Sequence, residues 1–280
     1  MAGARTRVSR TRRYPSHPPA HARRRRPRWL ALALGILLWP GATLGDDLSC
    51  PADRHDQSVV SSRVFDGDTL ALGDGRKVRL LGINTPEIGH DGKPSEPYAV
   101  QARAMLERFA GPGTRLNLRL DTERYDRYGR LLAHVFTDDG TNLQALLLAA
   151  GYATTLVVPP NQWSLACYAA VQTKARARRA GLWSEGRYQP VPAEELADSA
   201  RGYHLVTGSV QRVGESRGNL WLNLAPHVAV RIPKDDLIYF GALDPRSLAG
   251  RRLEVRGWIH RRRGELRITV RHPSALTILD

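Results

Sequence analysis

The chain has 280 residues, and a prior of roughly one domain per 150 residues favours two domains. Hydrophobic residues make up 42% and charged residues 25%, which excludes disorder, collagen and a disulfide-dense mini-protein as descriptions of the whole chain. The net charge of +15 is uneven: residues 1–45 carry +10, residues 46–200 carry −2 and residues 201–280 carry +7. Because a leader that is removed binds nothing afterwards, the total charge alone does not indicate a nucleic-acid-binding protein.

Residues 1–45 have the pattern of a signal peptide or an N-terminal anchor. An arginine-rich stretch ending at Arg28 precedes the apolar run Trp29–Trp39, which is shorter than the roughly 20 residues of a membrane span. Gly45 offers a small residue for cleavage. The pattern predicts an exported protein, periplasmic or secreted. The alternative is an uncleaved anchor, and only in that case do we expect contact with a membrane.

The sequence contains two cysteines, Cys50 and Cys167. In an exported chain a small even number of cysteines favours one disulfide. Such a bond would tie the mature N-terminus to a predicted helix. Two free buried thiols are the alternative.

The first half of the chain alternates strand and helix patterns. Apolar and β-branched residues predict a strand over 61–72, a turn at Gly73-Asp74-Gly75 and a return strand over 77–83. Helical patterns that end near glycine are expected at 98–110, 142–150 and 161–180. Further strands are predicted at 115–120 and 130–137.

A proline-containing stretch within residues 186–200 is typical of a linker, and the pattern after it is all strand. Strict alternation over 219–224, 252–260 and 265–271 predicts half-buried antiparallel strands. With about five strands and one short helix near 234–240, residues 201–280 suit a second, small all-β barrel of the OB type.

Four fragments place polar groups where a buried strand should have none. They are Asp66-Gly67-Asp68-Thr69 inside an apolar strand, Arg79 in the next strand, Asn84-Thr85-Pro86-Glu87 at the end of that strand, and Asp126-Arg127-Tyr128-Gly129-Arg130 before another. A buried unpaired charge at Arg79 would cost several kcal/mol, so this residue needs an anionic partner in the protein or in a ligand.

The chemistry of this set suits metal-assisted phosphodiester hydrolysis. Hard oxygen ligands favour Ca²⁺ or Mg²⁺ over zinc. Two arginines can hold a phosphate, and a carboxylate near a metal can deprotonate water. Taken singly, an Asp-Gly-Asp is more often a turn and a strand arginine is more often salt-bridged within the protein. Only the set, in this order, is specific.

In this order the fragments resemble the thermonuclease (staphylococcal nuclease) family. The matching pieces are Val64–Leu70, Val78–Glu87, Asp126–Arg130 and Gly181–Trp183, within a domain over 57–185. The resemblance implies an α+β fold in which an OB-like five-stranded barrel carries three helices. It also implies a Ca²⁺-dependent, sugar-nonspecific endonuclease that acts on DNA and RNA without a small-molecule cofactor.

The resemblance assigns roles residue by residue. Asp68 and the backbone carbonyl of Thr85 match calcium ligands, and Glu87 matches the proposed general base. Arg79 and Arg130 match the arginines that hold the phosphate and stabilise the transition state. Arg127 and Tyr128 match a basic residue and a tyrosine that contact a terminal phosphate.

Two departures from the family pattern concern the metal ligands and the contacts to the nucleobase. Asn84 stands where the best-known member has a second calcium aspartate. An amide oxygen can still bind Ca²⁺, but one negative charge is lost, so we expect weaker calcium affinity or another divalent metal. The base-stacking tyrosines expected after the second helix are missing from residues 154–160, which leaves the base contacts open.

The C-terminal module offers aromatic and basic side chains on its polar strand faces. Trp221 and Trp258, with Arg256, would form a surface on which single-stranded bases stack while cations follow the phosphates. The alternative is a solvated barrel whose tryptophans pack against the first domain.

Three functions are therefore open. The first is the exported nuclease. The second is a catalytically weak or inactive protein that binds nucleic acid or another polyanion, and the third is an envelope scaffold. The presence of Glu87 favours the enzyme, because binding alone needs no general base.

Overall fold

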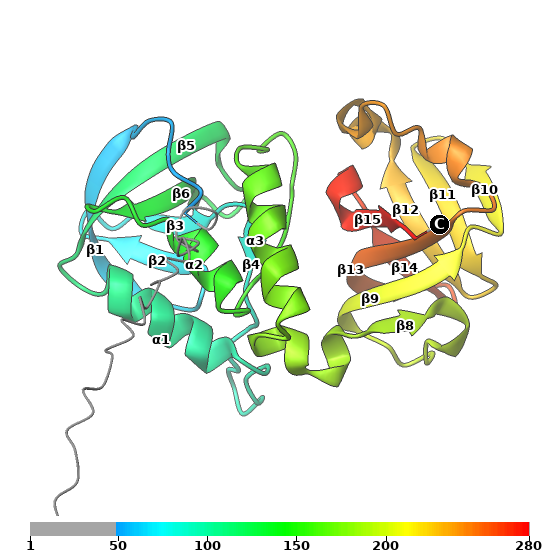
Figure 1. The fold of residues 1–280 in the computed structure, drawn as a ribbon, viewed down its shortest axis with the longest axis horizontal. Coiled ribbons are helices and arrows are strands. Elements are labelled where there is room, and N and C mark those ends of the chain that lie inside the picture. The colour runs from blue at the N-terminus through cyan, green and yellow to red at the C-terminus, as the bar shows by residue number, and fades with distance from the viewer. Residues whose placement is uncertain (1–48, 280) are drawn as a thin grey trace, which may run out of the picture. The chain divides into compact units, whose positions relative to one another are not determined.

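A computed structural model describes residues 49–279 (Figure 1). The leader expected over 1–45 lies outside the described residues. In the part of the chain that is described, no helix is long and apolar enough to cross a membrane.

Five strands form a closed barrel in the order β1-β2-β3-β6-β5 (Figure 1). Their bounds are β1 Gln57–Val64, β2 Thr69–Leu72, β3 Lys77–Leu80, β5 Arg115–Tyr125 and β6 Leu131–Thr137. Neighbours pair antiparallel except β3 and β6, which run parallel. A buried apolar cluster of residues such as Leu70, Leu80 and Leu118 forms its core. The predicted α+β fold with an OB-like barrel is confirmed.

The sequence analysis expected one strand over 61–72, but the structure has two strands there. β1 ends at Val64 and β2 begins at Thr69, with Val64 paired to Leu70 across an antiparallel hairpin. The amide of Phe65 donates to the carbonyl of Thr69 at 3.0 Å and closes the turn. Asp68 therefore lies in the hairpin turn directly before β2, and not in the middle of a strand.

The predicted strand over 77–83 is interrupted at Gly82. This residue has a positive φ of 79°, and an added Cβ would lie 2.7 Å from the ring of Tyr168. Only glycine fits both constraints. The chain then resumes as β4 (Ile83–Asn84), which pairs with β7 (Thr154–Thr155) outside the barrel.

Three α-helices accompany the barrel in the described residues: α1 Ala99–Ala110, α2 Leu143–Ala149 and α3 Leu165–Ala177. The side chain of Asn142 caps α2 by accepting from the amide of Ala145 at 3.0 Å. α3 begins four residues later than the pattern predicts, because Asn161 exchanges hydrogen bonds with the backbone of Glu123 at 2.8 and 3.1 Å.

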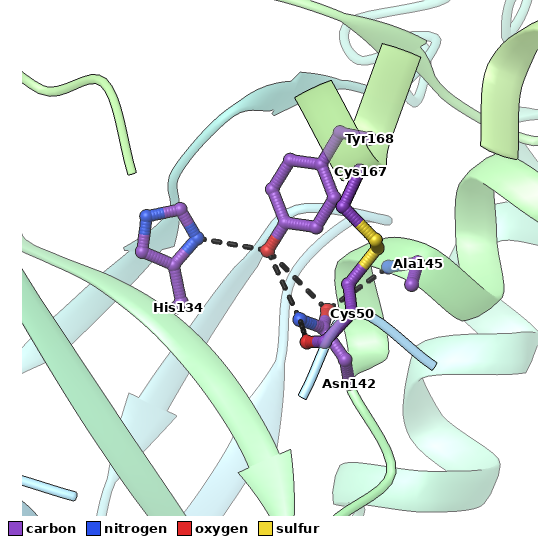
Figure 2. Close-up of a disulfide and its surroundings, with 6 residues drawn as sticks. All are labelled: Cys50, His134, Asn142, Ala145, Cys167 and Tyr168. Carbon is purple, nitrogen blue, oxygen red and sulfur yellow. Dashed lines mark hydrogen bonds between the residues drawn. A yellow bond between two sulfur atoms is a disulfide. The ribbon is translucent and has the colours of Figure 1, made fainter. Parts of the chain in front are cut away.

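A disulfide joins Cys50 to Cys167 in α3, the pairing expected for an exported chain (Figure 2). Beside it the hydroxyl of the buried Tyr168 lies 2.9 Å from Nδ1 of His134 in β6 and 3.3 Å from Oδ1 of Asn142. The bond and this hydrogen-bond network together fix α3 to the barrel and to the first described residues.

The C-terminal part of the chain is all β, as predicted. Its strands follow the order β10-β11-β12-β14-β13-β9-β8, and β15 pairs with β13 (Figure 1). The bounds are β8 Pro190–Pro192, β9 Gly202–Ser209, β10 Arg212–Glu215, β11 Asn219–Ala225, β12 Val228–Pro233, β13 Arg252–Arg262, β14 Glu265–Thr269 and β15 Leu276–Ile278. Among the described residues β10 and β8 do not pair with each other, so this sheet is not closed by backbone bonds like the first.

Period-two patterning places the apolar side chains of this sheet in one core. Leu220, Leu222 and Ile268 are fully buried there. The short helix expected over 234–240 is a 3₁₀ helix, η4 (Lys234–Phe240). The other 3₁₀ helices are η1 Gly181–Ser184, η2 Gly186–Tyr188, η3 Ala193–Glu195, η5 Pro245–Leu248 and η6 Pro273–Ala275.

The segment 186–200, expected as a linker, is structured. Tyr188 is buried, and β8 pairs in parallel with β9. Proline lacks an amide proton but is tolerated in an edge strand, which explains why the prolines of β8 do not prevent pairing.

A third buried cluster joins residues on both sides of this segment. Its members include Trp183, Tyr188, Tyr203 and Leu205. The carboxylate of the buried Glu254 in β13 accepts two hydrogen bonds from Arg176 in α3, at 2.7 and 2.6 Å. Residues 49–279 lie within one compact unit, Thr43–Asp280.

Candidate functional site

Asp68 is buried where β2 begins, with 6% of its surface exposed. Its Oδ2 accepts hydrogen bonds from the amide and the hydroxyl of Thr85, at 2.9 and 3.1 Å. Oδ1 accepts from the hydroxyl of Thr69 at 3.1 Å. Asp68 directly precedes β2 and Thr85 directly follows β4, so the fold brings two of the expected calcium ligands together.

Arg79 in β3 has the anionic partner that its position requires. Its Nη2 lies 3.1 Å from Oδ2 of Asp68. The same nitrogen donates to Oδ1 of Asn84 at 3.3 Å and to the carbonyl of Ile83 at 3.0 Å, and Nη1 donates to the carbonyl of Leu80. The guanidinium therefore links the expected metal ligands to the expected phosphate site.

Asn84 forms hydrogen bonds with two other residues expected at the site. Its Nδ2 donates to the carbonyl of Thr85 at 2.9 Å while its Oδ1 accepts from Arg79. An aspartate could not donate the first of these bonds. The carbonyl expected to bind calcium thus carries a hydrogen bond that is specific to asparagine.

Three carboxylates lie close enough to influence one another here. Burial, then the charge of Asp68, raises the pKa of Asp66. Partial burial, then the charge of Asp68, raises the pKa of Glu87, and Arg79 opposes this shift. In residues 49–279 no group of three His, Cys, Asp or Glu side chains is arranged to hold a metal. The expected metal ligands differ from such a group, because besides Asp68 they are the amide oxygen of Asn84 and the carbonyl of Thr85.

The backbone of Glu87 is held by a residue that the sequence analysis did not identify. The amide of Glu87 donates to Oε2 of Glu96 at 3.1 Å, and the amide of Glu96 donates back to the carbonyl of Glu87 at 3.0 Å. Arg187 in η2 in turn forms an ion pair with Glu96 at 3.0 Å. No local pattern could have revealed this contact, because Arg187 lies 91 residues away in the chain.

Arg130 is oriented by Asp126, its neighbour in a tight turn. The guanidinium Nε lies 2.7 Å from one carboxylate oxygen, and the other accepts from the amides of Tyr128 and Arg130 at 2.9 and 3.0 Å. Burial acts to raise the pKa of Asp126, but these bonds outweigh it and hold the value below the ordinary 3.8. Asp126 is a positioning residue for Arg130.

Arg127 and Tyr128 form a pair beside Arg130. Nη2 of Arg127 donates to the hydroxyl of Tyr128 at 2.6 Å, and its guanidinium carbon lies 4.8 Å from the ring centre. Tyr128 is 68% exposed. Both side chains are therefore free to meet a ligand.

These basic residues line one cleft of about 410 Å³. Arg79, Arg127, Tyr128 and Arg130 share it. Leu156 and Val158 belong to the segment that lacks the tyrosines of the family. They make this part of the cleft wall apolar. Arg271, after β14, also lines the cleft, and the alternating pattern over 265–271 gave no sign of that.

The three module residues expected to bind substrate do not line this cleft and are less exposed than predicted. Trp258 packs edge-on against Tyr203 at 5.1 Å in the third buried cluster. Trp221 donates from Nε1 to the hydroxyl of Ser216 at 3.1 Å. Arg256 donates to the carbonyl of Ser274. Tyr203 belongs to the same sheet as Trp258, and the third buried cluster on which Trp258 packs also contains Leu182 and Trp183 of the first domain.

Comparison with known proteins places the site in a family context. A family model described as "Staphylococcal nuclease homologue" matches residues 77–185. The chain is 31% identical over 159 residues to the thermonuclease of Staphylococcus intermedius, covering 55% of this chain and 93% of that protein. It is 31% identical over 175 residues to an uncharacterized endonuclease of Escherichia coli, covering 59% and 94%.

A third relative, endonuclease YhcR of Bacillus subtilis, is 25% identical over 211 residues, which cover 71% of this chain but only 17% of that protein. The two 31% matches span nearly the whole of shorter relatives, and the structure has the five-stranded closed barrel that the resemblance implied. The chain therefore belongs to the family of staphylococcal nuclease homologues.

Proposed function

We propose that this nuclease hydrolyses phosphodiester bonds of DNA and RNA with the help of Ca²⁺, as an exported enzyme. The observation that carries the proposal is that Arg79 and Arg130 line one cleft while Arg79 contacts both Asp68 and Asn84. Phosphate-binding cations and oxygen ligands thus adjoin at one place. Two of the relatives are named thermonuclease and endonuclease.

The donor set fits a hard divalent cation. Asp68, Oδ1 of Asn84 and the carbonyl of Thr85 would hold Ca²⁺, which prefers carboxylate and carbonyl oxygens. Burial, then the charge of Asp68, raises the pKa of Asp66, and a bound cation would offset the repulsion between these two carboxylates. When bound, the ion would act as a Lewis acid on a phosphate oxygen.

The chain's own residues would carry the remaining steps. Glu87 would take the proton of a water whose oxygen bonds to phosphorus, and the bond from phosphorus to the 5′ oxygen would break. The products are a 3′-phosphate and a 5′-hydroxyl, which takes up a proton. Arg79 and Arg130 would donate to the phosphate oxygens on which negative charge develops.

Export is supported by the disulfide between Cys50 and Cys167, because such bonds persist in oxidising compartments. The basic, apolar leader pattern of residues 1–45 points the same way. We propose the periplasm or the medium as the location, and single-stranded nucleic acid as the substrate.

Cleavage of single-stranded DNA by the purified chain, with Ca²⁺ and with EDTA, tests the proposal. We expect EDTA to abolish cleavage and Glu87→Gln to lower kcat by about 10²–10⁴, the usual contribution of a general base. Glu107→Gln, an exposed carboxylate on α1, is the matched control and should cleave normally. Full activity of Glu87→Gln would exclude the assigned base.

The second candidate, a binding protein, is favoured by one contact. The carbonyl of Thr85 accepts a hydrogen bond from Asn84, which would compete with a metal for that oxygen. DNA binding without cleavage in Ca²⁺, Mg²⁺ or Mn²⁺ would support this candidate against the enzyme.

A further inference from the structure

A second pocket adjoins the cleft that Arg79 and Arg130 line. Its volume is about 230 Å³, and it shares Leu156, Val158 and Arg271 with the cleft. Because the same three side chains line both cavities, a strand that crosses Leu156 and Val158 from the phosphate arginines would reach the second pocket. Most of the second pocket comes from the C-terminal sheet, which lies outside the residues matched by the family model.

The lining of the second pocket suits a nucleobase with its phosphate. Trp258 and Tyr203 provide aromatic surface, and Arg256, His260 and Arg271 provide donors or positive charge. Every base has a face that stacks on an aromatic ring, while cations follow the backbone. The partial burial of Trp258 does not conflict with this role, because the ring packs on Tyr203 on one side and still lines the pocket.

Arg271 is held in place for a phosphate. Its Nε and Nη2 donate to the carboxylate of Asp236 at 2.8 and 2.9 Å. Asp236 is buried, with 3% of its surface exposed, whereas the Arg271 side chain is 42% exposed. A guanidinium fixed through one edge presents its remaining donors at the junction of the two cavities.

Further aromatic and basic side chains lie on the polar face of the sheet outside the pocket. Strand register pairs Trp258 with Tyr203, Thr269 with Arg231, and Arg231 with Trp221. Thr269 and Trp258 both line the pocket. The guanidinium of Arg267 lies 4.7 Å from the ring centre of Trp221. Aromatic and basic side chains therefore lie on five neighbouring strands, on the face opposite the apolar core: Trp221 in β11, Arg231 in β12, Arg267 in β14, Trp258 in β13 and Tyr203 in β9.

We propose that the C-terminal sheet extends the nuclease cleft with a second nucleotide subsite, which binds single-stranded nucleic acid beyond the bond that is cleaved. In it Arg271 contacts the phosphate between the two cavities and Trp258 stacks on a base. The inference rests on the proposed nuclease function but does not depend on which metal is used.

The test compares substrate lengths. For the full chain, kcat/KM is measured on a dinucleotide and on a single strand of about 12 nucleotides, within the range that one OB-type surface covers. We expect the wild type to favour the longer strand. Trp258→Leu should reduce the ratio of the two kcat/KM values about tenfold, the loss typical of one stacked base. The double substitution Arg271→Gln with Asp236→Asn, which keeps the net charge, should reduce it severalfold.

The matched control is Glu215→Gln with Arg246→Gln, an exposed ion pair of 2.8 Å between β10 and η5 that lines neither cavity. It should keep the wild-type ratio. A wild type that shows no length preference would overturn the subsite, as would a normal ratio in both folded variants. Equal losses on duplex DNA would overturn stacking, because a duplex base is not free to stack.

Fluorescence anisotropy of the same labelled strands, with the Glu87→Gln chain as background, measures binding without cleavage. Length-dependent binding that Trp258→Leu weakens about tenfold supports the subsite even if the chain cleaves nothing, in which case only the proposed activity fails. Should Trp258→Leu not fold, His260→Ala replaces it, because His260 is exposed and lines the same pocket.

Discussion

At the scale of single residues, Asn84 distinguishes the proposed calcium site from the family pattern. Its amide donates to the carbonyl of Thr85 and accepts from Arg79, so this neutral side chain joins these two groups without adding charge. An aspartate in its place would leave the Thr85 carbonyl without that donor and would add a negative charge beside Asp68. Both effects favour a divalent cation.

We therefore predict that Asn84→Asp binds Ca²⁺ about tenfold more tightly, since one added carboxylate ligand contributes on the order of 1.4 kcal/mol. Calcium titration followed by tryptophan fluorescence measures the affinity independently of cleavage. Asn223→Asp in β11 adds the same charge in the other sheet and should leave the affinity unchanged. No gain in Asn84→Asp would show that the amide binds the metal as well as a carboxylate does.

The site residues proposed from the sequence include a pair that local structure brings together. Asp126 and Arg130 lie four residues apart, and one turn closes their ion pair. Glu96, Arg187 and Arg271 escaped sequence analysis, because each acts through a partner that is close only in the folded chain.

At the scale of elements, β6 and α3 are joined by polar contacts inside the core. Nδ1 of His134 lies 2.9 Å from the hydroxyl of Tyr168 (Figure 2). On the other side of the ring, Nε2 lies 3.9 Å from the carboxylate of Asp121. Burial lowers the pKa of His134, while Asp121 acts in the opposite direction and the charge of Arg119 adds to the lowering. Protonation of His134 therefore opposes folding.

The free energy of unfolding should depend on pH through the protonation of His134. The unfolded chain protonates His134 near pH 6.5 and the folded chain only at a lower pH, so the free energy of unfolding falls as pH drops below about 6.5. Between pH 7.5 and 5.5 we expect the wild type to lose about 1 kcal/mol more than His134→Gln, which cannot titrate. Urea unfolding at the two pH values measures this, and equal losses would contradict it.

Element boundaries were predicted where a breaker or a cap defines them. Asn142 begins α2 as a capping residue should. The hairpin at residues 65–68 was missed, because Asp-Gly-Asp within an apolar run fits both a strand and a turn. Pairing of Val64 with Leu70 resolved the ambiguity, and pairing is a property of two strands, not of one segment.

At the scale of the whole molecule, α3 and β13 share the ion pair of Arg176 and Glu254. Glu254 is 5% exposed, so it would be left as a buried charge if its partner were removed. We predict that Arg176→Ala lowers the free energy of unfolding by about 3 kcal/mol. Urea unfolding of the double variant Arg176→Met with Glu254→Leu supplies the control.

That double variant should be close to wild type, because apolar replacement of both partners removes the desolvation cost along with the attraction. If the single and double variants lose the same stability, the pair does not act as a buried ion pair.

Deletion of residues 201–280 would uncover Trp183 and Tyr188, which pack against Tyr203 and Leu205 in the third buried cluster. Point substitutions are therefore the cleaner way to examine what the C-terminal sheet contributes.

The sequence by itself predicted the barrel with its helices and the all-β segment that follows, and it proposed the set of oxygen, guanidinium and carboxylate groups for the site. These depend on periodicity, caps and short spacings, which are local. Only the tertiary structure decided that Asn84 donates to Thr85, that Trp258 packs on Tyr203, and that Arg271 stands where two cavities meet. Each of these contacts depends on the exact register and packing of elements, and hydrophobic patterning does not specify which distant side chain fills a given space.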